Sequence, residues 1–216
     1  MKHEDVFWDL ISSLDTSGLL PHVMIIGSWA EYIYSFYFNE DYVPSFKSHD
    51  IDVLYSNPFL EVAGGEHLVH EMSNAGFLAP TEGGALRAFY KDGLEVEFLT
   101  SQLGTGPGLI ELPNTGIVAE RLANVDMLRP IAVAANNYLV KVPSPASYLC
   151  HKLYINPSRR PPSKKPKDIE AVRLLLMHLQ NRPEEMKALR SYLSSLSEER
   201  QQQIRKVARS ASLELP

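Results

Sequence analysis

The pattern of hydrophobic and polar positions predicts that strands and helices alternate through the first part of the chain. Apolar residues recur at helical spacing near the N-terminus, whereas "HVMII" and "IDVLY" are short, continuous apolar runs typical of buried strands. Gly27-Ser28 ends the first of these runs and precedes an aromatic-rich helical pattern. The pattern therefore predicts helices over 3–15, 29–38 and 65–77, strands over 22–26 and 51–55, and a loop over 39–48.

Two β-hairpins are predicted after these elements. Asp92-Gly93 is a turn signal between apolar runs at 85–90 and 94–99, and Asn136-Asn137 plays the same part between 128–135 and 138–142. Alternate strand residues point to opposite faces of a sheet. In the strand over 94–99 the two faces therefore hold Leu94, Val96 and Phe98 on one side and Glu95, Glu97 and Leu99 on the other.

The character of the chain changes after Val142. Ser144-Pro145 begins "SPASYLCHKLYI" with the N-cap and first-turn residues that helices favour. A basic, proline-containing segment follows, which we interpret as a loop over 156–167, and three helical patterns then occupy 168–180, 183–194 and 197–211. We therefore expect a mixed core over residues 1–142 and a helical region over residues 143–216.

Composition narrows the class of protein. The hydrophobic fraction of 44% and the charged fraction of 22% are ordinary for a soluble domain, and no apolar run reaches the roughly 18 residues of a membrane span. The single cysteine, Cys150, and the acidic residues near the N-terminus lead us to expect a cytoplasmic protein. A net charge of −5 argues against broad, unspecific binding of nucleic acid.

Asp50 and Asp52 are the first candidates for chemistry. They flank one isoleucine at the start of a predicted strand, so both carboxylates share one face and can reach one site. Hard divalent cations such as Mg²⁺ are commonly held by one or two carboxylates together with substrate phosphates. Gly27-Ser28, between a strand and a helix, lets the backbone approach a phosphate. A third acid could come from Glu97 or Glu95.

The order of these motifs resembles the nucleotidyltransferase superfamily, whose fold is that of DNA polymerase beta. The matching segments are "MIIGSWAEYIY", "HDIDVLY" and "LEVEFLT". "KVPSPASYLCHKLYI" and "RRPPSKKPKDIEAVRLLL" are similar to one branch, the AbiEii-type bacterial proteins. The resemblance covers roughly residues 22–176 and implies an α+β fold: a mixed sheet with flanking helices, followed by a helical C-terminal part.

The resemblance also implies an activity, namely metal-dependent transfer of a nucleotide from an NTP to an acceptor, with release of pyrophosphate. The acceptor would be a protein, an RNA such as tRNA, or a small molecule. The AbiEii-type branch includes toxins, so an antitoxin is an implied partner. The implied roles are Mg²⁺ or Mn²⁺ binding by Asp50, Asp52 and Glu97, triphosphate binding by Gly27, Ser28 and Lys152, and orientation of Lys152 or the base by Asp168.

Other interpretations of the same residues remain open at this point. The paired aspartates can be a solvated strand end, and Glu95 and Glu97 can be the wet face of an edge strand. The chain can be a non-catalytic binding or regulatory module of the same fold; a phosphatase with an aspartate nucleophile is disfavoured because "FKSHD" precedes the pair. His49 and His151 are interpreted as supporting or surface groups, and "GTGPG" (104–108) as a loop. The basic run is either a solvated loop or a tRNA contact; it consists of Arg159, Arg160, Lys164, Lys165 and Lys167.

Overall fold

The computed structural model describes residues 3–39, 41–45, 48–82, 85–102 and 108–216. Within these ranges the α-helices are α1 (His3–Thr16), α2 (Ser28–Tyr37), α3 (Leu68–Asn74), α4 (Pro145–Ile155), α5 (Lys164–Gln180), α6 (Pro183–Ser195) and α7 (Glu198–Ser210). The strands are β1 (Val23–Ile26), β2 (Asp50–Tyr55), β3 (Thr81–Glu82), β4 (Ala85–Leu86), β5 (Ala88–Lys91), β6 (Leu94–Ser101), β7 (Leu109–Glu111), β8 (Val118–Leu122), β9 (Pro130–Ala135) and β10 (Tyr138–Pro143).

The central sheet is mixed and confirms the predicted fold class. Its strand order is β1-β2-β6-β8-β7, and β5 also pairs with β6. β2 and β6 run parallel, with Asp50 opposite Glu95 and Asp52 opposite Glu97, while β1 is antiparallel to β2. The two central strands therefore bring the predicted carboxylates together across neighbouring positions of one sheet.

The two predicted hairpins are present, and their turns explain why. Asp92 and Gly93 both have positive φ angles, of 49° and 81°, between the antiparallel strands β5 and β6. Asn136 and Asn137 have φ angles of 46° and 67° between β9 and β10. Residues that tolerate positive φ allow two-residue turns whose twist matches that of the flanking strands.

The faces of the sheet differ in chemistry. One face presents Ile51, Val53, Val96 and Phe98, which are buried in the main apolar cluster with residues of α1, α2 and α3. The opposite face carries the carboxylates of β2 and β6 and, further along the strands, a small second apolar cluster. That cluster consists of Met24, Ile26, Leu54, Leu99, Val125 and Leu128. Strict alternation along the strands thus separates the core from the candidate site.

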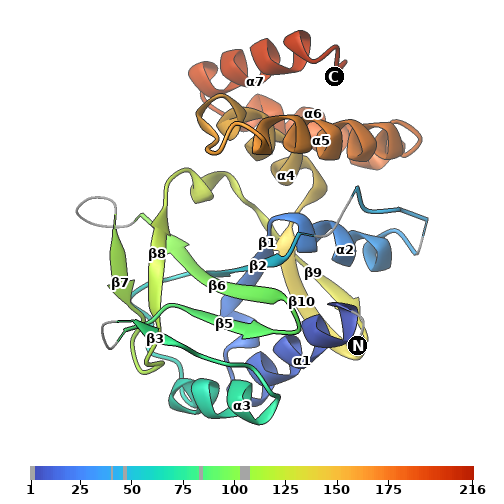
Figure 1. Cartoon of the computed structure of the whole chain (residues 1–216). Helices are drawn as coiled ribbons and strands as arrows, with labels where there is room; N and C mark the ends of the chain where they lie inside the picture. The colour runs from blue at the N-terminus through green and yellow to red at the C-terminus, as the bar shows by residue number, and fades with distance from the viewer. Residues whose placement is uncertain (1–2, 40, 46–47, 83–84, 103–107) are drawn as a thin grey trace.

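The C-terminal helices α5, α6 and α7 lie together at one end of the molecule, and α1 and α3 lie at the other end (Figure 1). α4 lies between the C-terminal helices and the strands and follows β10, which pairs with β9 in a separate two-stranded sheet. α4 begins at a capped N-terminus, where the Ser144 side chain accepts a hydrogen bond from the backbone N–H of Ser147. Its buried residues pack against α5, α6 and α7. In the described part of the chain, no helix has the length and apolar character needed to cross a membrane.

Three sequence-based predictions need correction. The segment 156–167 is not a loop throughout, because Asn156–Ser158 is a 3-10 helix and α5 already begins at Lys164. The predicted strand over 85–90 is divided into β4 and β5. The sequence pattern also missed β7 and β8, which are short and partly exposed. Most of "GTGPG", residues 104–107, lies outside the described residues.

Candidate active site

The predicted carboxylates share one face of the sheet and one cavity. Asp50 and Asp52 project from β2, and Glu97 lies opposite Asp52 on β6. All three line a cavity of about 250 Å³ that α4 and the segment after it close from the other side. Glu95 shares their face but does not line this cavity; it accepts a hydrogen bond of 2.6 Å from the hydroxyl of Tyr90. This placement favours Glu97 over Glu95 as the third acid.

Gly27 allows the close approach of Asp52 to the turn between β1 and α2. Its φ angle is +69°, and a Cβ atom added there would lie 2.4 Å from Oδ2 of Asp52. Ile26 is the register partner of Asp52, so the glycine follows directly beside the carboxylate pair. Any other residue at position 27 would have a strained backbone, because its φ angle is positive, and its Cβ atom would displace the Asp52 carboxylate. The glycine is therefore required by both the turn and the site.

Ser28 begins α2 at this turn and is buried, but its hydroxyl is already engaged. Its Oγ lies 2.8 Å from the Oγ of Ser48 and accepts a hydrogen bond of 3.0 Å from the backbone N–H of Ser48. The indole of Trp29 holds the same residue through a 3.2 Å hydrogen bond to the Ser48 carbonyl. The chain before β2 is thereby fixed against the start of α2, next to Asp50.

Lys152 and Asp168 contact each other, as the sequence analysis allowed. Nζ of Lys152 lies 2.8 Å from Oδ1 of Asp168, and Nε of Arg159 lies 2.8 Å from Oδ2 of the same carboxylate. Asp168 is only 2% exposed. Burial alone would raise the pKa of Asp168, but the two cations hold this pKa below its usual value. Asp168 thus fixes two cations from different segments in one place.

A second, smaller cavity of about 120 Å³ adjoins the first and brings opposite charges together. It is shared by Gly27, Ser28, Ser48, the two aspartates and the C-terminal cations Lys152, Arg159, Lys164 and Lys167, together with Asp168. Most of the basic run therefore faces the carboxylates across a narrow space. Neither of the two interpretations from sequence, a solvated loop or a tRNA contact, anticipated this placement.

Asp52 and Glu97 are hard to ionise in the absence of a cation. Burial and the nearby charge of Asp50 raise the pKa of Asp52 to about 6, against the lowering effect of Lys164 and Arg159. Burial and the charges of Asp52 and Glu95 raise the pKa of Glu97 to about 7. Two acids that titrate near neutral pH because of burial and mutual repulsion are typical of sites that bind cations or transfer protons.

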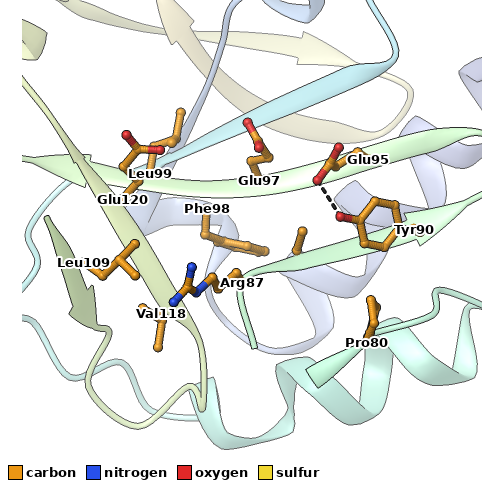
Figure 2. Close-up of a pocket in the computed structure, with 11 residues that line it drawn as sticks. Pro80, Arg87, Tyr90, Glu95, Glu97, Phe98, Leu99, Leu109, Val118 and Glu120 are labelled. Carbon is orange, nitrogen blue, oxygen red and sulfur yellow. Dashed lines mark hydrogen bonds between the residues drawn. The ribbon is translucent and has the colours of Figure 1, made fainter. Parts of the chain in front are cut away.

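A further cavity, of about 310 Å³, lies on the other side of Glu97 (Figure 2). β5 pairs with β6 up to Glu97, and β8 pairs with the same edge of β6 from Leu99 onward, so the two strands leave a gap between them. Glu95, Glu97 and Glu120 line this gap together with Tyr90 and Arg87. Glu97, Leu99 and Glu120 line both cavities, which are therefore neighbours. In the first, Lys152, Arg159 and Lys164 face the carboxylates, whereas in the second Arg87 is the cation beside the glutamates.

The residues present fit a divalent cation, although they do not form a closed set of ligands. Within the ranges that the structure describes, no three His, Cys, Asp or Glu side chains are grouped as a ready-made metal site. Asp50, Asp52 and Glu97 nevertheless present carboxylate oxygens on one face, and Gly27 lets the Asp52 carboxylate lie close against the turn. Mg²⁺ takes few protein carboxylates and completes its shell with water and phosphate oxygens. An open set of this kind suits a cation that arrives with a nucleotide.

Sequence reasoning interpreted His151 as a supporting or surface group and overlooked Ser48. His151 lines the 250 Å³ cavity beside Lys152, and burial lowers its pKa to about 4. The sequence could have indicated this placement, because residues 148, 151, 152 and 155 lie on one face of the predicted helix, and Lys152 was already a candidate site residue. Ser48 gave no signal from sequence, because its role depends on the fold of the segment before β2.

Comparisons with known proteins identify the family of the chain. A family model described as nucleotidyltransferase matches residues 6–196. No curated protein matches the chain. The AbiEii-type branch is not named by this match and stays a prediction.

Several solved structures resemble parts of this chain at low sequence identity. A solution structure of the antibiotic-resistance factor ANT(2'')-Ia is 17% identical, covers 90% of this chain and 94% of its own, and has a TM-score of 0.47. A crystal structure of ANT(2'')-Ia with adenylyl-2''-tobramycin is 15% identical, with coverages of 87% and 96% and a TM-score of 0.49. An antigenic nucleotidyltransferase-like protein from Paracoccidioides brasiliensis is 16% identical, with coverages of 94% and 91% and a TM-score of 0.46. Because the family model spans most of the chain, the protein belongs to this nucleotidyltransferase family.

Proposed function

We propose that this protein transfers a nucleotide from an NTP to a hydroxyl group of an acceptor and releases pyrophosphate, with the help of Mg²⁺ or Mn²⁺. The observation that carries the proposal is the pairing of opposite charges across one site. Asp50 and Asp52 stand on the sheet, and Lys152, Arg159 and Lys164 face them from the C-terminal part. A metal–triphosphate complex needs both, because carboxylates bind its cation and ammonium or guanidinium groups bind its phosphates.

Asp50, Asp52 and Glu97 would hold the divalent cation. When bound, the cation would neutralise charge on the triphosphate and favour attack by the acceptor hydroxyl. Gly27 has no side chain and Asp52 lies close against it, so the backbone at the start of α2 would approach a phosphate beside this carboxylate. Because the hydroxyl of Ser28 is bonded to Ser48, we assign phosphate contact to the backbone at this turn and assign the serine hydroxyl to holding the turn in place.

The chain's own groups can account for the charges of the reaction. The acceptor oxygen forms a bond to the α-phosphorus, and the bond from this phosphorus to the bridging oxygen of the β-phosphate breaks. Lys152, Arg159 and Lys164 stabilise the negative charge that builds up on the departing pyrophosphate. The hydroxyl proton would pass to solvent water, because Glu97 would hold the cation. Its raised pKa of about 7 belongs to the protein without metal, and a bound cation would lower this pKa.

The acceptor would enter through the 310 Å³ cavity, which Glu97 separates from the nucleotide side. The classes of acceptor remain a protein, an RNA or a small molecule. Three glutamates, Glu95, Glu97 and Glu120, outnumber the one arginine, Arg87, at this entrance, which disfavours a polyanion such as tRNA there. The structure therefore favours a protein side chain or a small molecule over tRNA.

A labelling experiment tests this function. The protein is incubated with α-labelled or γ-labelled NTPs, Mg²⁺ and a cell extract as the source of acceptor. The proposal expects the α-label in a new product and the γ-label in pyrophosphate. Asp52→Asn should abolish both, whereas Lys187→Ala, which changes an exposed lysine on α6, should not. If NTP binds but no label is transferred from any NTP, the protein is instead a non-catalytic binding module.

A further inference from the structure

One stripe of α4 lines the nucleotide cavity. Tyr148, His151, Lys152 and Ile155 all border it, at positions i, i+3, i+4 and i+7 of the helix. Such residues lie on one face of a helix, while Leu149, Cys150 and Leu153 are fully buried elsewhere on α4. Only Lys152 on this stripe has a role in the proposed function. The role of His151 therefore needs its own explanation.

The 250 Å³ cavity has polar and apolar lining residues, and a nucleotide likewise has a polar triphosphate and a flat base. Its polar part holds the aspartates and the cations, which suit a metal and a triphosphate. Its apolar wall is built from the second apolar cluster and its neighbours: Ile26, Leu99, Leu122, Val125 and Leu128. An apolar wall next to a phosphate site is suited to the flat faces of a nucleobase, whose polar edge then requires a specific partner.

His151 offers that partner. Its Nε2 atom is buried and has no hydrogen-bond partner in the part of the chain that the structure describes. Burial and the nearby charges of Lys152 and Arg159 lower the pKa of His151 to about 4, so the ring is neutral near pH 7. A neutral imidazole has one donor and one acceptor nitrogen. A buried nitrogen without a partner is unfavourable in a folded protein unless a ligand group completes its bonding.

We propose that His151 hydrogen-bonds the polar edge of the nucleobase and sets which NTP the protein prefers. This inference rests on the proposed function, because it places an NTP in the cavity. It assigns α4 two adjacent tasks, with Lys152 directed to the phosphates and His151 to the base. Contacts to the triphosphate are the same for all NTPs, so selection among NTPs depends on contacts to the nucleobase.

The test compares nucleotide affinities, which require no acceptor. Dissociation constants for ATP, GTP, CTP and UTP are measured by calorimetry with Mg²⁺ for wild type, His151→Ala and His151→Phe. Inorganic tripolyphosphate serves as a ligand without a base, and 2'-deoxy NTPs report on the ribose. His67→Ala, at an exposed histidine that lines none of these cavities, is the matched control. Melting temperatures of the nucleotide-free proteins are recorded in parallel.

We expect wild type to prefer one base, and both His151 variants to lose about three- to tenfold in affinity for it, as the loss of one hydrogen bond predicts. Tripolyphosphate should bind all four proteins equally. His151→Phe should melt no lower than wild type, because it removes an unpaired buried nitrogen. Unchanged relative affinities among the four NTPs would overturn the inference, as would a change confined to the ratio of NTP to 2'-deoxy NTP. If wild type binds neither NTP nor tripolyphosphate, the proposed function itself fails.

Discussion

Replacing Asp52 by asparagine should stabilise the metal-free protein above neutral pH while it removes metal binding. Asp52 is largely buried beside Asp50, and its pKa is raised to about 6. A carboxyl group whose pKa is raised on folding binds its proton more tightly in the folded state. Its favourable contribution is therefore present at low pH and is lost as the pH rises through the folded pKa.

The magnitude follows from the shift. A rise from 3.8 to about 6 corresponds to about 3 kcal/mol at full ionisation, since one pKa unit equals about 1.4 kcal/mol. Two effects reduce this value: solvent partly screens the Asp52 carboxylate, and the asparagine amide must itself be hydrated or hydrogen-bonded. We therefore expect the free energy of unfolding to rise by about 1–2 kcal/mol. For a chain of this size, that gain raises the melting temperature by about 2–8 °C.

Thermal unfolding of wild type and Asp52→Asn in chelator from pH 4 to pH 8 is the assay. The advantage of the variant should be small at pH 4, grow between about pH 4 and pH 6, and then level off, because this is the range between the unfolded and folded pKa values of Asp52. Adding Mg²⁺ should stabilise wild type only. Asp15→Asn, at an exposed aspartate of α1, controls for loss of charge. A variant that melts below wild type at pH 8 without metal would refute the reasoning and make Asp52 a structural residue.

Three further substitutions test other parts of the site. Gly27→Ala should abolish NTP binding and destabilise the fold by about 1–2 kcal/mol, because the new Cβ meets Asp52 and the backbone has a positive φ angle. Calorimetry measures the binding and thermal unfolding measures the stability. Normal NTP binding would contradict this account of the turn. Lys152→Ala should lower kcat/KM for transfer about ten- to a hundredfold, which is the effect of losing one charge-assisted contact. The melting temperature should change little, because Asp168 still forms its ion pair with Arg159. A transfer rate equal to that of Lys187→Ala would exclude a phosphate role for Lys152. Asp168→Ala should instead lower the free energy of unfolding by about 3–5 kcal/mol, because two partly buried cations lose their counter-charge. Denaturant unfolding measures this change. An unchanged midpoint would show that the ion pairs of Asp168 contribute nothing to stability.

Much of the fold could be predicted because local signals agreed with the final structure. The alternation in "LEVEFL" correctly placed Glu95 and Glu97 on the face away from the core, and Asp92-Gly93 and Asn136-Asn137 correctly marked hairpin turns. These signals are local, since a strand's faces follow from period-two alternation and a tight turn from residues that tolerate positive φ. β7 and β8 were missed because they are short, partly exposed strands without a continuous apolar run. β7 pairs with the neighbouring β8, and only the pairing of β8 with β6 joins more distant segments.

The site itself was only partly visible in the sequence. Asp50, Asp52 and Glu97 could be found because the spacing within one strand and the order of motifs indicate a shared face. The position of the basic segment could not be found in this way, because its prolines suggested a loop and nothing local indicates which surface it faces. The buried carboxylate of Asp168 directs this segment toward the aspartates, and that contact spans two helices. The division at residue 142 stays a prediction.

The most direct test of the central claim is calorimetric binding of an NTP, with and without Mg²⁺, to wild type and Asp52→Asn at pH 8. The opposed carboxylates and cations predict that wild type binds NTP tightly only when Mg²⁺ is present, and that Asp52→Asn loses this dependence on the metal. NTP binding by wild type that is equally tight in chelator, or no binding of any NTP with any divalent metal, would contradict the claim that these carboxylates form a metal–nucleotide site.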